Sequence, residues 1–217
     1  MKTDAQIREE IFKELKWEPT IRDIEIGVSV KDGVATLSGN VRTFAQKFAA
    51  DRAAERVAGV QVVADELNVK LTDGQERSDT EIAHAVANVL KWDSEVPDAV
   101  KARVDNGWIW LEGDVEWQFQ KEAAERAIRY LTGVRGVTNT VRIKPTLASP
   151  VEVSKKIKEA LVRGAQFDAD RIVVEAQAGK ITLRGTVRSY AERKEAERAA
   201  WSAPGVTDVE DKIAIGV

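Results

Sequence analysis

The sequence predicts an α+β fold made of three tandem α-β-β-α-β units, each a two-layer α/β sandwich. Three observations support this prediction. A segment of 14 residues recurs at spacings of 74 and 72 residues. Each copy holds two short alternating runs around a turn signal, and apolar residues at helical spacing lie on both sides of it. We therefore expect each unit to place two helices on one face of a three-stranded sheet.

The repeated segment also divides the chain. Its copies are VSVKDGVATLSGNV (28–41), ARVDNGWIWLEGDV (102–115) and VEAQAGKITLRGTV (174–187). Together with their flanks they predict units at residues 1–71, 78–145 and 149–217. The linkers, 71–77 and 144–148, are short, so neighbouring units should touch one another.

Each unit is expected to open with a helix. A hydroxyl residue followed three positions later by Glu or Gln forms a capping box at equivalent places: Thr3 with Gln6, Ser78 with Glu81, and Ser149 with Glu152. Pro150 suits the first position of the third helix. Apolar residues then recur at helical spacing: Ile7, Ile11, Leu15; Ile82, Val86, Leu90; Val153, Ile157, Leu161. Each of these helices has one face to bury.

Two strands joined by a tight turn follow the first helix. In the first unit, apolar residues alternate with polar ones: Ile24, Ile26, Val28, Val30, and, after the turn, Ala35 and Leu37. The pairs Asp32-Gly33 and Asn106-Gly107 favour a type I′ turn, because both of its central residues need a positive φ. The third unit has the weaker pair Ala178-Gly179.

A second helix and a last strand complete each unit. The helix is expected to begin at Thr43 and Ser189, and a glycine follows its end at Gly59, Gly133 and Gly205. Its inner face is lined by small residues: Ala50, Ala53, Ala54, Val57; Ala124, Ala127, Ile128, Leu131; Ala196, Ala199, Ala200, Ala203. A short polar side chain recurs at equivalent positions before the last strand: Asp65, Asn139 and Asp211. We predict that it hydrogen-bonds nearby backbone and fixes the entry of that strand.

The hairpin pattern V-x-x-G-x-x-x-L-x-G-x-V, followed by an alanine-rich helix that ends in Gly-Val, resembles the BON domain. The matching residues of the first unit are Val30, Gly33, Leu37, Gly39, Val41 and Gly59-Val60. The pattern recurs in the other two units, with Ala176 in place of the first valine in the third. The resemblance covers nearly the whole chain.

The resemblance implies a non-enzymatic binding protein. Proteins similar to these include osmotically induced bacterial proteins and envelope proteins, and the family is regarded as binding phospholipid surfaces or other envelope components. We therefore expect a role in osmotic or envelope stress, with a phospholipid membrane surface or an envelope-associated protein as partner. The N-terminal segment has no apolar core of the secretory type, so a cytoplasmic location is expected. The location would be periplasmic if Met1 had been added to a mature exported chain.

The middle unit carries the candidate binding residues. Four of the six tryptophans lie in it, at positions 92, 108, 110 and 117. Trp108 and Trp110 alternate with Ile109 and Leu111, so both indoles should face away from the helices. Residues of the same outward phase on the adjacent strands are Lys101, Arg103 and Arg142. Tryptophan interleaved with cations suits a contact surface for a partner protein, a lipid headgroup layer or stacked bases.

Other interpretations of this face remain open. It could pack against a neighbouring unit or a second copy of the chain, and the array could form a homo-oligomer or filament through it or through exposed sheet edges. A weaker alternative is ion or small-ligand binding by the units.

Composition and motifs argue against several functions. The net charge of −3 gives no general electrostatic reason to bind nucleic acid or anionic lipid, so any such binding must come from local patches. The GxxG at 133–136, which resembles a phosphate-binding loop, occurs in one unit only. The chain has no cysteine, and its single histidine, His84, lies on the polar side of its helix. No nucleophile is paired with a base. We therefore expect no catalytic residues, no metal site, no cofactor and no nucleic-acid partner.

Overall fold

The computed structural model describes residues 2–21, 26–72, 74–144, 149–163 and 171–216. The predicted strand residue Ile24 and the linker at 145–148 lie outside the described residues. Units 1 and 3 have the predicted order α-β-β-α-β, and unit 2 has two further short strands, β6 and β8. Unit 1 comprises α1 (Asp4–Trp17), β1 (Ile26–Lys31), β2 (Val34–Val41), α2 (Phe44–Glu55) and β3 (Val62–Val69). Unit 2 comprises α3 (Asp79–Trp92), β4 (Lys101–Asp105), β5 (Trp108–Glu112), β6 (Asp114–Val115), α4 (Gln118–Ile128), β7 (Gly136–Asn139) and β8 (Arg142–Ile143). Unit 3 comprises α5 (Pro150–Arg163), β9 (Ile172–Gln177), β10 (Lys180–Val187), α6 (Tyr190–Trp201) and β11 (Asp208–Ile215).

The first helices begin where the capping boxes predict. Thr3 and Ser78 each accept a hydrogen bond from the third backbone N–H of their helix, and the Gln6 and Glu81 side chains bond back to the cap backbone. In α1, Ile7, Ile11 and Leu15 are buried, so the predicted apolar stripe faces the sheet.

Each sheet combines an antiparallel hairpin with a parallel third strand. The order in unit 1 is β1-β2-β3, and unit 3 has the same order in β9, β10 and β11. The predicted two-residue turns are confirmed, because Asp32, Asn106 and Ala178 all adopt a positive φ near 50° (51°, 50° and 48°). The strand orders, including β4-β5-β7 in unit 2, place the parallel strand at one edge of the three-stranded sheet in every unit.

The second helices pack closely on the sheets because their inner faces are small. Ala50, Ala53 and Ala54 of α2 are fully buried, as are Ala196 and Ala200 of α6. A face without large side chains lets the helix axis approach the strands and bury the leucines and isoleucines between the layers.

The recurring polar residue bonds to the backbone as predicted. Asp65 accepts the Leu67 N–H at 2.9 Å, Asn139 accepts the Val141 N–H at 3.3 Å, and Asp211 accepts the Ile213 N–H at 2.9 Å. The predicted position ahead of the last strand is wrong in two units, since Asp65 and Asp211 lie inside β3 and β11. There each carboxylate faces the helix layer and pairs with a cation of the second helix, Lys47 or Arg193.

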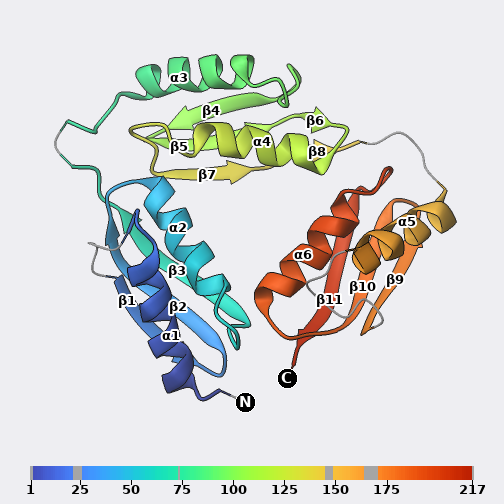
Figure 1. Cartoon of the computed structure of the whole chain (residues 1–217). Coiled ribbons are helices and arrows are strands. Elements are labelled where there is room, and N and C mark those ends of the chain that lie inside the picture. Colours follow the sequence, from blue (N-terminus) through green and yellow to red (C-terminus); the bar gives the residue numbers. More distant parts are fainter. Residues whose placement is uncertain (1, 22–25, 73, 145–148, 164–170, 217) are drawn as a thin grey trace.

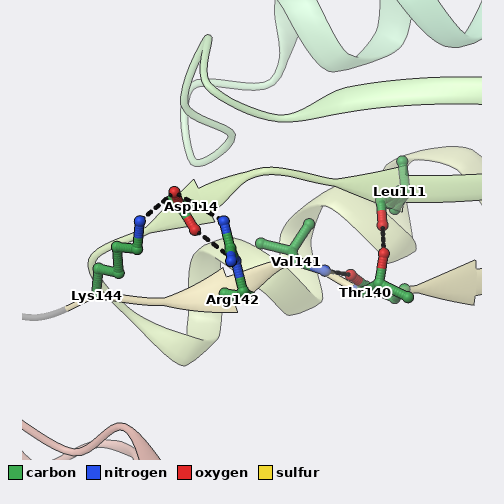
Figure 2. A network of polar contacts seen from close by, with 7 residues as sticks. Leu111, Asp114, Thr140, Val141, Arg142 and Lys144 are labelled. Atoms are coloured by element: carbon green, nitrogen blue, oxygen red, sulfur yellow. Dashed lines mark hydrogen bonds and ion pairs between the residues drawn. The ribbon is translucent and has the colours of Figure 1, made fainter.

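Unit 2 departs from a single three-stranded sheet. Its strands form a sheet of order β4-β5-β7 and a separate parallel pair, β6-β8. Between the two, the backbone N–H and the hydroxyl of Thr140 both donate to the Leu111 carbonyl, at 2.8 and 2.7 Å (Figure 2). The regular ladder of hydrogen bonds stops at this carbonyl, which accepts two of them. The ladder resumes where the Arg142 N–H donates to the Gly113 carbonyl, at 2.9 Å.

In Figure 1, α2 of unit 1 and α6 of unit 3 lie on the sides of these units that face each other, and unit 2 lies across the top of both. The two ends of the chain lie together, since Lys2 and Asp4 line the same pocket as Ile215 and Gly216. None of the helices within the described ranges is long and apolar enough to cross a bilayer.

Candidate functional site

The two candidate tryptophans lie on the sheet face that the helices leave open. Along β5 the burial alternates: Ile109 and Leu111 are fully buried, whereas Trp108 is 41% exposed and Trp110 is partly exposed. In the strand register, Trp108 lies opposite Asp105 and Trp110 lies opposite Arg103, so each indole shares its face of the sheet with that partner. Both indoles therefore face away from α3 and α4, as predicted.

The Trp108 ring lies flat on the neighbouring strand. A Cβ added to Gly136, its partner on β7, would come within 2.4 Å of the indole, so the ring occupies the space that glycine leaves. The indole N–H donates to the Thr138 hydroxyl at 2.9 Å. Its centroid is 6.3 Å from that of Trp110. Trp108 is thus held by β7 and by the Thr138 hydroxyl, and the Trp110 ring lies next to it.

Arg103 is the cation that the structure brings to this surface. Its guanidinium carbon lies 4.0 Å from the centroid of the Trp110 ring, within the range of a cation–π contact. It also faces Asp105, at 3.7 Å. Lys101, opposite Glu112 in the register, lies on the same face and is exposed. We call the surface formed by Lys101, Arg103, Trp108, Trp110 and Thr138 the tryptophan face.

Arg142 lies apart from the indoles. It has the predicted outward phase, but its guanidinium pairs with Asp114 at 2.9 Å, and Lys144 pairs with the same carboxylate at 2.6 Å (Figure 2). Hydrogen bonds from Lys144, then those from Arg142, keep the pKa of Asp114 below its ordinary value. The two cations therefore share one acid at the end of the sheet, and neither contributes a contact to Trp108 or Trp110.

The open faces of the other units carry different chemistry. In unit 1, the positions that correspond to the two indoles are Val34 and Thr36. In unit 3 they are Lys180 and Thr182, and the face is a ladder of ion pairs: Lys180 with Asp208 and Glu210, Lys212 with Glu210, and Arg184 with Glu175. Hydrogen bonds from Lys212 and Lys180 lower the pKa of Glu210 to about 2. The aromatic surface is thus a property of unit 2.

Sequence reasoning missed a second pair of exposed indoles. Trp17 and Trp92 end α1 and α3 at equivalent positions, with exposures of 81% and 85%. Their positions in the sequence could have indicated this exposure. Each tryptophan follows the last leucine of the buried helix face by two residues, and residues two apart do not lie on the same face of a helix.

The described part of the chain holds no group of three or more His, Cys, Asp and Glu residues arranged to bind a metal ion. His84 is exposed on α3, on the polar side where its phase places it.

Comparison with known proteins places the chain in a family. The BON domain matches residues 3–70, 78–145 and 151–216. Osmotically-inducible protein Y of Escherichia coli (strain K12) is 32% identical over 148 residues, which cover 65% of this chain and 73% of that protein. A solved structure of CdsD, a structural protein of the type III secretion system of Chlamydia trachomatis, aligns over 96% of this chain and 91% of its own, with 14% identity and a TM-score of 0.28. That TM-score is too low to carry an argument. The three domain matches and the similarity to the osmotically inducible protein show that this chain belongs to the BON domain family.

Proposed function

We propose that the chain is a non-catalytic binding protein that docks through the tryptophan face on anionic phospholipid surfaces or on partners associated with them. The single observation that carries this proposal is the aromatic and cationic surface that α3 and α4 leave uncovered. The similarity to an osmotically inducible protein supports a role in osmotic or envelope stress.

The chemistry of the face fits the interfacial layer of a bilayer. Tryptophan rings are favoured there because they are apolar in body and carry one polar N–H. Since the Trp108 N–H is already satisfied by Thr138, that ring presents mainly apolar area. Lys101 and Arg103 lie beside the rings and attract anionic headgroups. Arg103 is partly neutralised by Asp105, so we expect the rings to contribute more of the affinity than the charges.

Cosedimentation with vesicles tests the proposal. The variant Trp108→Val/Trp110→Thr places the residues of the unit 1 face at the same register positions, so the fold should be kept while the aromatic surface is removed. We expect the unaltered chain to bind phosphatidylglycerol vesicles more than phosphatidylcholine vesicles, and the variant to lose this binding. Trp17→Ala, which removes an exposed indole from unit 1, is the control and should still bind. Absence of binding to anionic vesicles at low salt would overturn the lipid proposal.

A homo-oligomer is the second candidate, favoured by the same uncovered face. Apolar rings exposed on a flat sheet suit a second copy of the chain as well as a membrane. The mass in solution, measured by sedimentation equilibrium, separates the two. A mass that rises with concentration and falls to the monomer in Trp108→Val/Trp110→Thr would support self-association, and a strict monomer would exclude it.

A further inference from the structure

Asn106 differs from every other asparagine of the chain in the residue that follows it. The other four asparagines, at positions 40, 68, 88 and 139, each precede a valine or a threonine, whose branched side chain screens the backbone nitrogen. Asn106 precedes Gly107, which has no side chain. The two residues form the turn between β4 and β5, where Asn106 is exposed and has a φ of 50°. The turn directly precedes Trp108 of the tryptophan face.

An asparagine that precedes a glycine reacts with its own backbone. The Gly107 amide nitrogen, after losing its proton to solvent, attacks the side-chain carbonyl carbon, Cγ, of Asn106. The new C–N bond closes a succinimide ring, and Nδ2 takes up a proton and leaves as ammonia. Water then opens one of the two imide C–N bonds, which gives either aspartate or isoaspartate. This chemistry makes asparagine one of the thermolabile residues.

The structure holds the attacking nitrogen in a hydrogen bond. The Gly107 N–H donates to one carboxylate oxygen of Asp79 at 2.9 Å, and the Asn106 N–H donates to the other at 2.8 Å. The Gly107 carbonyl accepts the Arg135 N–H at 2.9 Å. The side-chain amide of Asn106 donates to Asp105 at 2.7 Å. The nucleophile and the leaving group of the reaction are therefore both engaged in the folded turn.

The Asp79 carboxylate opposes the reaction in two ways. Its negative charge at hydrogen-bond distance disfavours the loss of the proton from the Gly107 nitrogen, because a second negative charge would form beside the first. In the succinimide, that nitrogen carries no hydrogen, so the bond from Gly107 to Asp79 must break before the ring closes. The reaction therefore gives up a charge-assisted hydrogen bond that the unreacted turn keeps.

The three units show the same relationship between acid and turn. In unit 1 the turn is Asp32-Gly33, a pair that forms the same imide by loss of water, and Asp4 accepts both of its N–H groups, at 2.9 and 3.3 Å. In unit 3 the turn is Ala178-Gly179, which cannot form an imide. Pro150, at the position of Asp4 and Asp79, has no acceptor in its side chain. The acid thus occurs in the two units whose turn is able to react and not in the third.

We propose that Asn106-Gly107 is a site of spontaneous deamidation, and that the Asp79 carboxylate keeps it in the unreacted form while unit 2 is folded. The site reacts when the hydrogen bonds between α3 and the turn are lost. Isoaspartate inserts one carbon into the backbone directly before Trp108, so the reaction alters the strand that carries the tryptophan face. The proposal does not depend on what that face binds.

Peptide mass spectrometry after incubation at mildly alkaline pH tests the proposal. Trypsin releases residues 104–121, in which Asn106 is the only asparagine. Deamidation changes the mass of this peptide by replacing NH2 with OH, and a second peak of equal mass marks isoaspartate. In urea we expect Asn106 to react faster than the other four asparagines, and in the folded chain it should react slowly. Asp79→Ala should raise the rate in the folded chain about tenfold or more, which corresponds to one hydrogen bond to a charged group.

Two further variants separate protection by Asp79 from general stability. Val86→Ala removes buried methyl groups from α3 but keeps Asp79, so it should leave the rate at Asn106 nearly unchanged. Ala178→Asn places an asparagine before Gly179 in unit 3, where Pro150 supplies no acid. The introduced asparagine, released by trypsin within residues 172–180, should react about tenfold or more faster than Asn106 of the same molecule.

Each contrary result removes a defined part of the proposal. If Asn106 reacts no faster than the other asparagines in urea, the site itself is refuted. A rate that Asp79→Ala leaves unchanged would contradict the protection, and a lower rate would mean that the carboxylate acts as a base on the Gly107 N–H. An equal increase in Val86→Ala would assign the effect to unfolding instead of Asp79. Equal rates at Asn106 and at the introduced asparagine would likewise overturn the role of the acid.

Discussion

The carboxylate of Asp79, in the first turn of α3, accepts a hydrogen bond from the backbone N–H of Gly107, 28 residues away, at 2.9 Å. Its other oxygen accepts the Asn106 N–H at 2.8 Å. Asp4 makes the same pair of bonds to Asp32 and Gly33 in unit 1, whereas unit 3 has Pro150 at the equivalent position. One side chain thus ties the first helix to the hairpin turn in two of the three units.

Replacing Asp79 by alanine should destabilise unit 2. The change leaves two turn N–H groups without their charged acceptor, which corresponds to a loss of about 1–3 kcal/mol. Urea unfolding followed by tryptophan fluorescence reports on this unit, since four of the six tryptophans lie in it. Asp98→Ala, at an exposed site, is the control, and an equal loss in both variants would contradict the role of the turn contact.

Gly113→Ala should destabilise unit 2 more strongly. Gly113 has a φ of 133°, and an added Cβ would lie 2.3 Å from the Ala99 carbonyl oxygen, so backbone must move. We expect a loss of about 3 kcal/mol or more in the same urea experiment. Gly74→Ala separates the two causes, because Gly74 also has a positive φ, 83°, but nothing within 4 Å of the added atom. Equal losses of unfolding free energy in the two variants would show that the positive φ alone, without the clash, accounts for the destabilisation.

Ala178→Asn should stabilise unit 3. Ala178 holds a φ of 48° at the turn, a conformation that asparagine adopts more readily than alanine. The expected gain is about 0.5–1 kcal/mol, measured as a rise in the midpoint of thermal unfolding by circular dichroism. Gln177→Asn, in the adjoining strand, should give no gain. A lower midpoint for Ala178→Asn would refute the prediction.

Asp51→Asn should remove a pH dependence of stability. Burial, and then the nearby charge of Asp65, raise the pKa of Asp51 from 3.8 to about 7. A raised carboxyl pKa means that the folded state favours the protonated form, so this group costs stability progressively as pH rises from about 4 to about 7. A shift of one pKa unit corresponds to about 1.4 kcal/mol of unfolding free energy. Because Asp51 is partly exposed to solvent, we expect its charge to lower the unfolding free energy by about 1–2 kcal/mol in all.

Unfolding free energies of Asp51→Asn and the unaltered chain, measured at pH 4 and pH 8, check this expectation. The variant should be the more stable of the two at pH 8, and the two should converge at pH 4. Asp98→Asn supplies the control at an exposed site. A variant that is less stable at pH 8 would mean that the Asp51 charge is favourable.

Local features of the sequence predicted the units themselves. Capping boxes, the period of the apolar residues and the turn pairs act over a few residues, and each matches the structure: Thr3 caps α1, Asn106-Gly107 forms the turn, and Ile109 and Leu111 are buried. The outward phase of Trp108 and Trp110 followed from the same alternation, because a strand has only two faces.

Contacts between distant residues lay beyond that reasoning. The sequence placed Arg142 in the same phase as the indoles. In the structure its partner is Asp114, which lies beside it in the parallel pair β6-β8. The break in the unit 2 sheet depends on both donors of Thr140 reaching the Leu111 carbonyl. The contacts of Trp108 with Gly136 and Thr138 likewise join distant residues, since Trp108 and Thr138 are 30 positions apart in the sequence.

The sequence by itself determined that the chain contains three BON-type units, where each helix and turn begins, and which face of the middle sheet carries tryptophan. These properties follow from short-range periodicity and backbone preferences, which repeat whenever the pattern repeats. Only the tertiary structure decided that Phe44 and Phe48 of unit 1 meet unit 2, and that Glu55 of unit 1 lines the same cavity as Tyr190 and Lys194 of unit 3. No local pattern encodes these contacts between units, because they join side chains far apart in the sequence that meet only after the units have folded.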